Sequence, residues 1–231
     1  MELINLTDSE KNNLDKQVSN IEKVVNEEIM SICNNIPNDN EILLLGECTH
    51  GTREFYEIRF EITKHMIINN GYKFVLLEAE WPDIIRINDY IQGRGFDKSA
   101  EESLLNIRKF PKWMWNNKIV IKLINWLKDY NDNNPKEMVY IFGIDCQQFL
   151  RSMKYILEYL KIHNSSFFEN ANTSLAIFRQ FITEGQYAGN AVYGPIKNYV
   201  NNIVTKLQEL LSTFQWDHVD SFLNDPNISR T

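Results

Sequence analysis

Residues 43–55 have the sequence LLLGECTHGTREF, in which an aliphatic run leads into a short polar turn. The run from Ile42 to Leu45 is continuously apolar rather than alternating, which predicts a strand buried on both faces of a parallel sheet. Gly46 and Gly51 bracket the turn, and a helical pattern follows it. This order of elements indicates an α/β fold, in which ligands bind just past the carboxyl ends of the strands.

Two further apolar runs predict a second strand over residues 72–78 and a third over residues 138–144. Apolar side chains at three- and four-residue steps predict helices around them. The approximate helical ranges are 9–36, 54–70, 84–91, 100–108 and 118–130, with a helical pattern again from 147 to 214. Strands that alternate with helices pair in parallel through right-handed crossovers, so their carboxyl ends share one edge. We expect a parallel sheet flanked by helices, incomplete with three strands, and a C-terminal helical region.

The pattern divides the chain into three parts. Residues 1–37 hold an N-terminal amphipathic helix, for which Asp8 or Ser9 is a suitable cap. Residues 38–147 form the α/β catalytic-core portion, and residues 148–231 form a helical insertion or lid. We expect the core to continue in a part of the fold that this sequence does not contain.

Composition limits the class of protein. With 231 residues and 43% hydrophobic content, the chain is long enough to bury a core in one domain or two. No apolar stretch approaches the ~20 residues of a membrane span, and the first residues lack the pattern of a signal peptide. A net charge of -7 disfavours a nucleic-acid groove, and three cysteines at no metal-finger spacing favour reduced thiols. We expect a cytoplasmic protein that binds neither nucleic acid nor a membrane.

Acidic side chains gather at the expected carboxyl edge of the sheet. They are Glu47 after the first strand, Glu78 and Glu80 after the second, and Asp145 after the third, with His50 in the first turn. Clustered carboxylates repel one another, so a purely structural role explains the set poorly. Glu47 and His50 are near enough in sequence to share a water or a substrate proton. The set therefore predicts a single catalytic cleft.

A cation is expected beside these acids, and Arg59 is the best candidate. It falls inside the apolar stripe that runs from Phe55 through Ile62 on the helix after the turn. A guanidinium on the core side of a helix needs an acidic partner, which Glu47 or Glu78 would supply.

Each of these residues also has an ordinary structural explanation. A histidine in a glycine-bounded turn is often a capping residue, Glu78 alone suits the following turn, and Arg59 alone can extend along the edge of a core. Trp81 and Trp115 are more typical of packing, although both are placed to border a substrate pocket together with Asp145. Their shared place on one edge is what favours a site.

Two familiar catalytic patterns are absent from the sequence. Residues 46–51 have the glycine spacing of a phosphate-binding loop, but the Thr-Arg pair at 52–53 replaces the required Lys-Ser/Thr, and Glu47 would repel phosphate. No Gly-x-Ser-x-Gly nucleophile turn occurs in the chain. Nucleotide hydrolysis and serine-esterase chemistry are therefore disfavoured.

Four ordered blocks of this sequence resemble the erythromycin esterase family. They are residues 46–56 with Arg59 (GECTHGTREFY), residues 78–83 (EAEWPD), residues 110–117 (FPKWMWNN) and residues 142–145 (FGID). The resemblance is close over residues 38–160 and looser over the later helices, which look like that family's helical insertion. It implies a hydrolase of macrolide antibiotics or related esters, and hence a role in antibiotic resistance; some relatives, labelled succinoglycan biosynthesis proteins, have no established substrate.

The resemblance also implies a role for each site residue. His50 matches the proposed general base, which activates water for attack on the ester carbonyl. The residues proposed to complete the site match Glu47, Arg59 and Glu78. No covalent intermediate and no cofactor are implied. The sequence departs from the family pattern at Cys48 and Glu80, and these departures leave the four site residues unchanged.

Family members continue through further strands with a His-Asn-x-His segment, which this sequence lacks. The expected partners are a small ester substrate and a missing C-terminal half. One alternative is a non-catalytic truncated remnant or assembly half. Another is a hydrolase whose site holds a divalent metal through Glu47, His50, Glu78 and Asp145. Metal dependence is the weaker alternative because Arg59 already supplies positive charge and no His-x-x-x-His pattern occurs.

Overall fold

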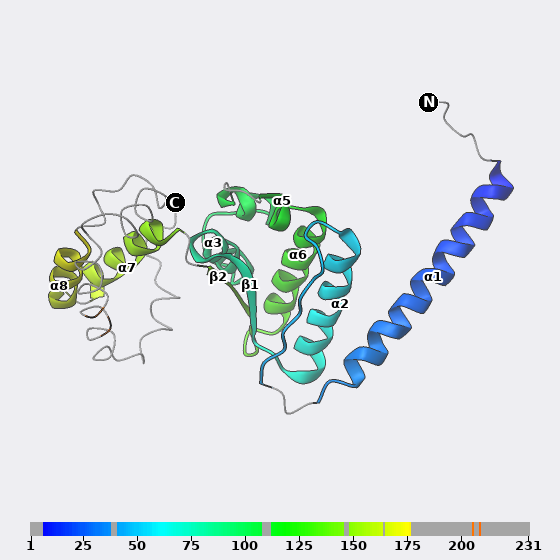
Figure 1. Ribbon diagram of the computed structural model, residues 1–231, viewed down its shortest axis with the longest axis horizontal. Coiled ribbons are helices and arrows are strands. Elements are labelled where there is room, and N and C mark those ends of the chain that lie inside the picture. Colours follow the sequence, from blue (N-terminus) through cyan, green and yellow to red (C-terminus); the bar gives the residue numbers. More distant parts are fainter. Residues whose placement is uncertain are drawn as a thin grey trace. The chain divides into compact units, whose positions relative to one another are not determined.

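A computed structural model of the chain describes residues 7–37, 41–107, 112–145, 148–163 and 165–176, together with residues 205 and 208. These residues form a mixed α/β structure in which a two-stranded parallel sheet is flanked by helices (Figure 1). The chain divides into two compact units, residues 1–73 with 117–123, and residues 74–116 with 124–231. Each unit is described by itself.

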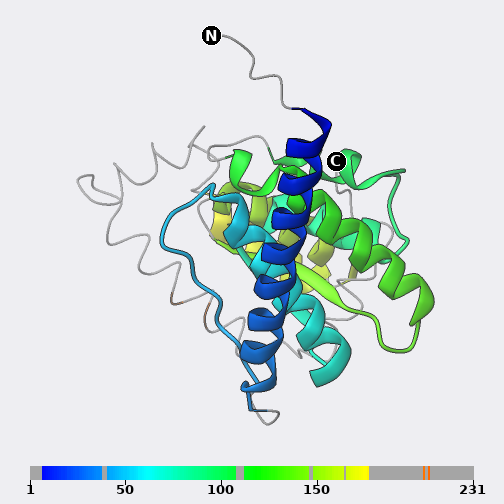
Figure 2. The same cartoon turned by 90° about the vertical axis from the view of Figure 1, so that its right-hand side faces the viewer.

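The first unit contains two long helices, α1 (Asp8–Asn34) and α2 (Arg53–Asn70). Figure 2 shows α1 as one continuous helix. Its cap is Thr7 rather than the predicted Asp8 or Ser9, because Thr7 and Glu10 form a reciprocal capping box: each side chain bonds the backbone N–H of the other. Gly71 ends α2 with a left-handed φ of 71°, which glycine adopts without steric cost.

A small hydrophobic core joins α1 to α2. The buried side chains of Ile29 and Cys33 on α1 contact those of Ile62 and Met66 on α2. Partly buried side chains surround them; these are Ile36, Leu43, Leu45, Ile58 and Tyr72. The periodicity that predicted the helices also placed Ile29, Ile62 and Met66 on the contacting faces, whereas Cys33 replaces the expected Ile32, which is 53% exposed.

The segment Ile42–Leu45, predicted as the first strand, is not a strand in the structure. Ile42 and Leu44 are 76% and 86% exposed, whereas Leu43 and Leu45 are partly buried against the α1–α2 core. The sheet among the described residues contains two strands and does not include this segment. The prediction was wrong because an apolar run indicates burial, while a strand also needs a neighbour that accepts its backbone hydrogen bonds.

The second unit holds the sheet. Strand β1 (Phe74–Glu80) pairs in parallel with β2 (Tyr140–Asp145), close to the second and third predicted strands. Phe74 lies opposite Tyr140 and Glu80 opposite Asp145, with an irregular register between Leu77 and Glu80. Glu78 and Glu80 thus belong to the carboxyl end of β1 instead of following it.

Helix α3 (Trp81–Ile91) contacts both strands and supplies much of the core. Four of its isoleucines are almost fully buried, namely Ile84, Ile85, Ile87 and Ile91. Side-chain amides form hydrogen bonds with backbone groups of β2 and of the residue before it. The Asn88 carbonyl oxygen accepts from the Ile141 N–H at 3.1 Å, and Asn131 bonds both the N–H (2.8 Å) and the carbonyl (2.9 Å) of Val139. These bonds satisfy buried backbone groups that the pairing with β1 leaves to other partners.

The remaining helices are short except for α6 and α7. Their bounds are α4 (Ala100–Ser103), the 3₁₀ turn η1 (Leu104–Asn106), α5 (Lys112–Trp115), α6 (Lys118–Asn133), α7 (Phe149–His163) and α8 (Ser165–Leu175). The predicted helical pattern after residue 176 lies outside the described residues. None of the described helices is long and apolar enough to span a membrane.

Polar contacts fix the start of α7 to the carboxyl end of β1 and the start of α3. The buried Asp83 carboxylate accepts from Gln148 Nε2 at 3.0 Å and pairs with Arg151. The Glu80 carboxylate accepts from the Gln148 backbone N–H at 2.8 Å. Glu80 and Asp83 therefore hold the start of α7 and are already used in structural contacts.

Candidate functional site

The turn between Leu45 and α2 presents Glu47 and His50. Gly51 has a φ of 85°, a left-handed conformation that a side chain would strain, and it reverses the chain directly after His50. Thr52 then precedes α2. The turn therefore needs a glycine at position 51, because other residues rarely adopt this conformation.

Glu47 and His50 are in direct contact. His50 Nδ1 lies 2.6 Å from Glu47 Oε1, so the carboxylate accepts the proton that Nδ1 carries. The contact orients the ring and favours a proton on Nδ1, since a carboxylate can only accept. The His50 side chain is 48% exposed, which leaves the ring accessible to water. This is the arrangement of a general base and its orienting group.

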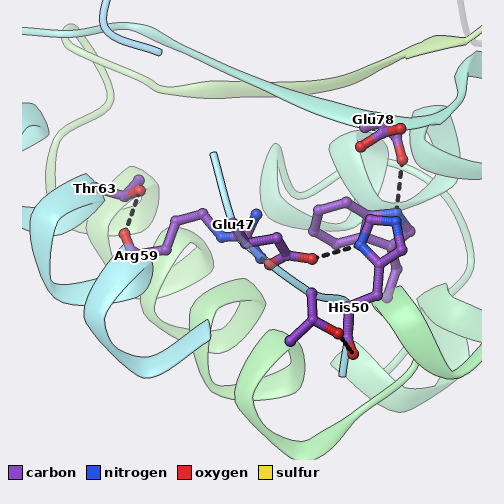
Figure 3. A network of polar contacts seen from close by, with 7 residues as sticks. Glu47, His50, Arg59, Thr63 and Glu78 are labelled. Carbon is purple, nitrogen blue, oxygen red and sulfur yellow. Dashed lines mark hydrogen bonds and ion pairs between the residues drawn. The ribbon is translucent and has the colours of Figure 1, made fainter. Parts of the chain in front are cut away.

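The second oxygen of Glu47 is bound by Arg59, as the helical pattern predicted. Arg59 Nη2 donates to Glu47 Oε2 at 2.7 Å, and Figure 3 shows the Arg59 side chain extending from α2 toward Glu47. The Arg59 side chain is 21% exposed. The Glu47 carboxylate itself is only 6% exposed. A buried carboxylate is stable only when its charge is paired and its lone pairs are used, and here each oxygen has one partner.

Tyr56 is a part of this site that the sequence analysis missed. It is buried at 6% exposure, and the Arg59 guanidinium carbon lies 4.9 Å from the centre of its ring. Burial raises the pKa of the Tyr56 hydroxyl, and the Glu47 charge raises it further, while the Gly51 backbone and Arg59 act in the opposite direction. A signal was present in the sequence, because Tyr56 and Arg59 are three residues apart on one helix face.

Glu78 and Asp145 lie together in the second unit. Glu78 is exposed near the end of β1, and its backbone oxygen accepts from Trp115 Nε1 at 2.9 Å. The pKa of Asp145, at the end of β2, is raised by burial first and by the charge of Glu78 second. These two acids are therefore neighbours at the carboxyl end of the sheet, as predicted.

The two tryptophans proposed for a substrate pocket have packing contacts. Trp115 is buried at 8% exposure. Trp81 meets Tyr155 edge to face at 5.5 Å and lies against the cluster that joins α7 to α8. Their role in binding substrate stays a prediction.

The structure thus assembles the predicted residues as two groups. Glu47, His50 and Arg59 form one group in the first unit, and Glu78 and Asp145 form another in the second. That the two groups line one cleft remains a prediction. Within the part of the chain that is described, no three His, Cys, Asp or Glu side chains are arranged to hold a metal ion.

Comparison with known proteins agrees with the resemblance in the sequence. Residues 67–226, more than half of the chain, match the erythromycin esterase family. The chain belongs to the erythromycin esterase family. The matched range contains Glu78, Trp81, Trp115 and Asp145, whereas Glu47, His50 and Arg59 precede it. The assignment of these three residues to a site therefore depends on their geometry.

The relatives are longer than this chain. An erythromycin esterase type II from Escherichia coli is 27% identical over 110 residues, which are 48% of this chain and 24% of that protein. The crystal structure of a succinoglycan biosynthesis protein superposes with a TM-score of 0.57 at 21% identity, covering 79% of this chain and 44% of the other. A protein from Bacillus cereus gives a TM-score of 0.44 at 24% identity over 57% of this chain and 30% of the other. The chain spans about a quarter of the curated relative and less than half of the first solved structure.

Proposed function

We propose that this chain carries the base-containing part of an esterase site, in which His50 activates water for attack on an ester carbonyl. The observation that carries the proposal is the contact of Glu47 with both His50 Nδ1 (2.6 Å) and Arg59 Nη2 (2.7 Å). This arrangement orients the imidazole and leaves Nε2 to accept a proton. Membership of the family supports hydrolysis as the reaction class.

In the proposed reaction, a water molecule donates a hydrogen bond to His50 Nε2 and attacks the carbonyl carbon of the ester. The water proton moves to Nε2 as the new carbon–oxygen bond forms. The tetrahedral intermediate then breaks the bond to the alkoxy oxygen, and the imidazolium returns the proton to the leaving alcohol. A positioned base of this kind contributes about 10²–10⁴-fold to the rate.

Glu47 and Arg59 have separate tasks in this proposal. The Glu47 carboxylate stabilises the positive charge that develops on His50, and Arg59 keeps that carboxylate in place. Glu78 has an exposed side chain near the end of β1, in the second unit, and its role in the site stays a prediction that rests on the family resemblance. The proposed substrate is a macrolactone or a related ester, since the relative from Escherichia coli is named an erythromycin esterase.

The proposal includes a partner, because the relatives are more than twice as long as the matched part of this chain. A polypeptide with the remaining part of the family fold would complete the sheet and the substrate pocket. One surface supports this: Phe74 and Leu76 on β1 and Ile144 on β2 are more than half exposed. Parallel sheets are normally covered on both faces.

The proposed location is the cytoplasm. Cys33 and Cys48 are free thiols, which suit a reducing compartment.

A mass-spectrometric assay tests the function. A panel of macrolactones and simple esters is incubated with the chain alone and with the chain plus a polypeptide that supplies the rest of the fold, and addition of one water is measured. We expect hydrolysis by the complex, little by the chain alone, and loss of most of the rate in His50→Asn, since Asn cannot accept the proton.

Three results would change the proposal. Undiminished hydrolysis by the His50→Asn complex would refute the base assignment. Loss of activity with EDTA would favour the divalent-metal alternative. No hydrolysis of any ester by the complex would favour a non-catalytic assembly half.

A further inference from the structure

The Tyr56 side chain is in contact with the cation that holds the site carboxylate. Its ring centre lies 4.9 Å from the guanidinium carbon of Arg59, and Tyr56 is 6% exposed. A cation over the face of an aromatic ring is attracted by the ring's electron density, more strongly when water is excluded. The contacts of the Arg59 guanidinium therefore include the Tyr56 ring and the Glu47 carboxylate.

The contacts form a chain that ends at the imidazole. The Tyr56 ring contacts Arg59, Arg59 Nη2 donates to Glu47 Oε2 at 2.7 Å, and Glu47 Oε1 meets His50 Nδ1 at 2.6 Å. The Arg59 backbone is held separately, since its carbonyl accepts from Thr63 Oγ1 at 2.7 Å. The orientation of the guanidinium therefore depends on its side-chain contacts.

We propose that Tyr56 is a positioning residue for His50, because its ring fixes Arg59 on Glu47 and thereby keeps the Nδ1–H tautomer of His50 dominant. Its part in turnover rests on the proposed function, whereas its effect on the tautomer does not. In this proposal the effect belongs to the face of the ring. The hydroxyl also interacts with Arg59, and its contribution is measured separately by the first variant below.

A pair of variants of nearly equal shape separates this effect from packing. Tyr56→Phe keeps an electron-rich ring, whereas Tyr56→pentafluorophenylalanine fills almost the same space with a ring face that no longer attracts a cation. Both are studied in the full chain without substrate. The ratio of His50 tautomers is measured by long-range ¹H–¹⁵N NMR at a pH where the ring is neutral.

We expect Tyr56→Phe to keep the Nδ1–H to Nε2–H ratio within about twofold of the parent. The fluorinated variant should lower the ratio by about fivefold, the order expected for a partly buried cation–π contact. Equal ratios in the two variants would overturn the proposal, and so would a fivefold loss in Tyr56→Phe. Because no substrate is present, failure of this test is distinct from failure of the esterase function.

Helix α2 offers a matched control. Lys64 Nζ lies 4.9 Å from the centre of the Phe60 ring, the same distance as in the Tyr56–Arg59 pair, but Lys64 bonds Glu61 and not Glu47. Phe60→pentafluorophenylalanine should leave the His50 tautomer ratio unchanged. A shift as large as that at Tyr56 would show a general effect of the fluorinated ring and would overturn the proposal. If the complex hydrolyses an ester, the fluorinated Tyr56 variant should lower kcat about fivefold with KM unchanged.

Discussion

Arg59 on helix α2 donates to Oε2 of Glu47, twelve residues earlier in the chain, across 2.7 Å. The Glu47 carboxylate is 6% exposed, so removal of its cation leaves a nearly buried charge without compensation. We predict that Arg59→Ala lowers the free energy of unfolding by about 3 kcal/mol, near the low end of the range for a broken buried pair. Urea denaturation followed by circular dichroism measures this.

Arg53→Ala is the matched control for that measurement. Arg53 also donates to a carboxylate at 2.7 Å, that of Glu57 on the same helix, but its side chain is 70% exposed. Solvent screens such an exposed pair, so its loss should change the stability far less than the loss of Arg59. Equal losses of stability in the two variants would show that the burial of Glu47 is not what makes Arg59 important.

Gly143 allows β1 and β2 to approach each other where the register is irregular. A Cβ at this position would lie 2.6 Å from both the carbonyl carbon and the oxygen of Glu80, and would also collide with the Ala79 oxygen. Backbone atoms cannot move aside as a flexible side chain can. Gly143→Ala should therefore destabilise the fold by about 1–3 kcal/mol, the usual cost of overpacking.

Gly46→Ala provides the comparison, since a Cβ there meets no atom within 4 Å. Thermal melting of the two variants measures the difference. A Gly143→Ala protein that melts at the temperature of Gly46→Ala would mean that the strands are further apart than the structure shows.

Asp145 makes the stability depend on pH. Burial and the nearby Glu78 raise its pKa in the folded chain above the ordinary value of 3.8, so the folded state binds more protons than the unfolded state just above pH 3.8. Stability from this group is present below that pH and is lost as the pH rises through the folded pKa. Asp145→Asn does not titrate, so its free energy of unfolding relative to the parent should increase with pH over this interval.

Chemical denaturation of the parent and of Asp145→Asn between about pH 3 and pH 7 measures the difference in their free energies of unfolding; this interval covers an acid whose pKa is raised from about 3.8. If the difference in free energy of unfolding between the two proteins stays constant with pH, the pKa of Asp145 is not raised in the folded chain. A second variant, Glu78→Gln, should reduce the pH dependence without removing it, because burial is the larger cause of the shift.

Local periodicity was enough to predict some parts of the structure. The helical stripe placed Arg59 on the core side of α2, and one acid in the preceding turn was within its reach. The runs at residues 72–78 and 138–144 predicted β1 and β2, which pair with each other and bury part of their side chains. The Arg59–Glu47 contact could be predicted because both residues lie close together in the sequence. The strand pair could be predicted because both strands lie in this chain.

Other parts depend on contacts that a single sequence does not specify. The run Ile42–Leu45 resembles a buried strand, but its pairing depends on a neighbouring strand, and none pairs with it among the described residues. No role was predicted for Tyr56 from the sequence, because the position of the Arg59 guanidinium over its ring is a contact that only the structure shows. The exposed Glu78 was predicted for the correct edge of the sheet, yet its place within β1 depended on the register of the strand pair.

Chemical rescue tests the central claim, that His50 is the base of a water-activating site, most directly. Substitution His50→Ala removes the imidazole and leaves a space, and free imidazole added to the solution can enter it and accept the proton from water. Ester hydrolysis by the complex of His50→Ala with the complementary polypeptide is measured against imidazole concentration. The account predicts a rate about 10²–10⁴-fold below the parent without imidazole, and a saturable increase as imidazole is added. A His50→Ala complex that hydrolyses the ester as fast as the parent, with no response to imidazole, would contradict it.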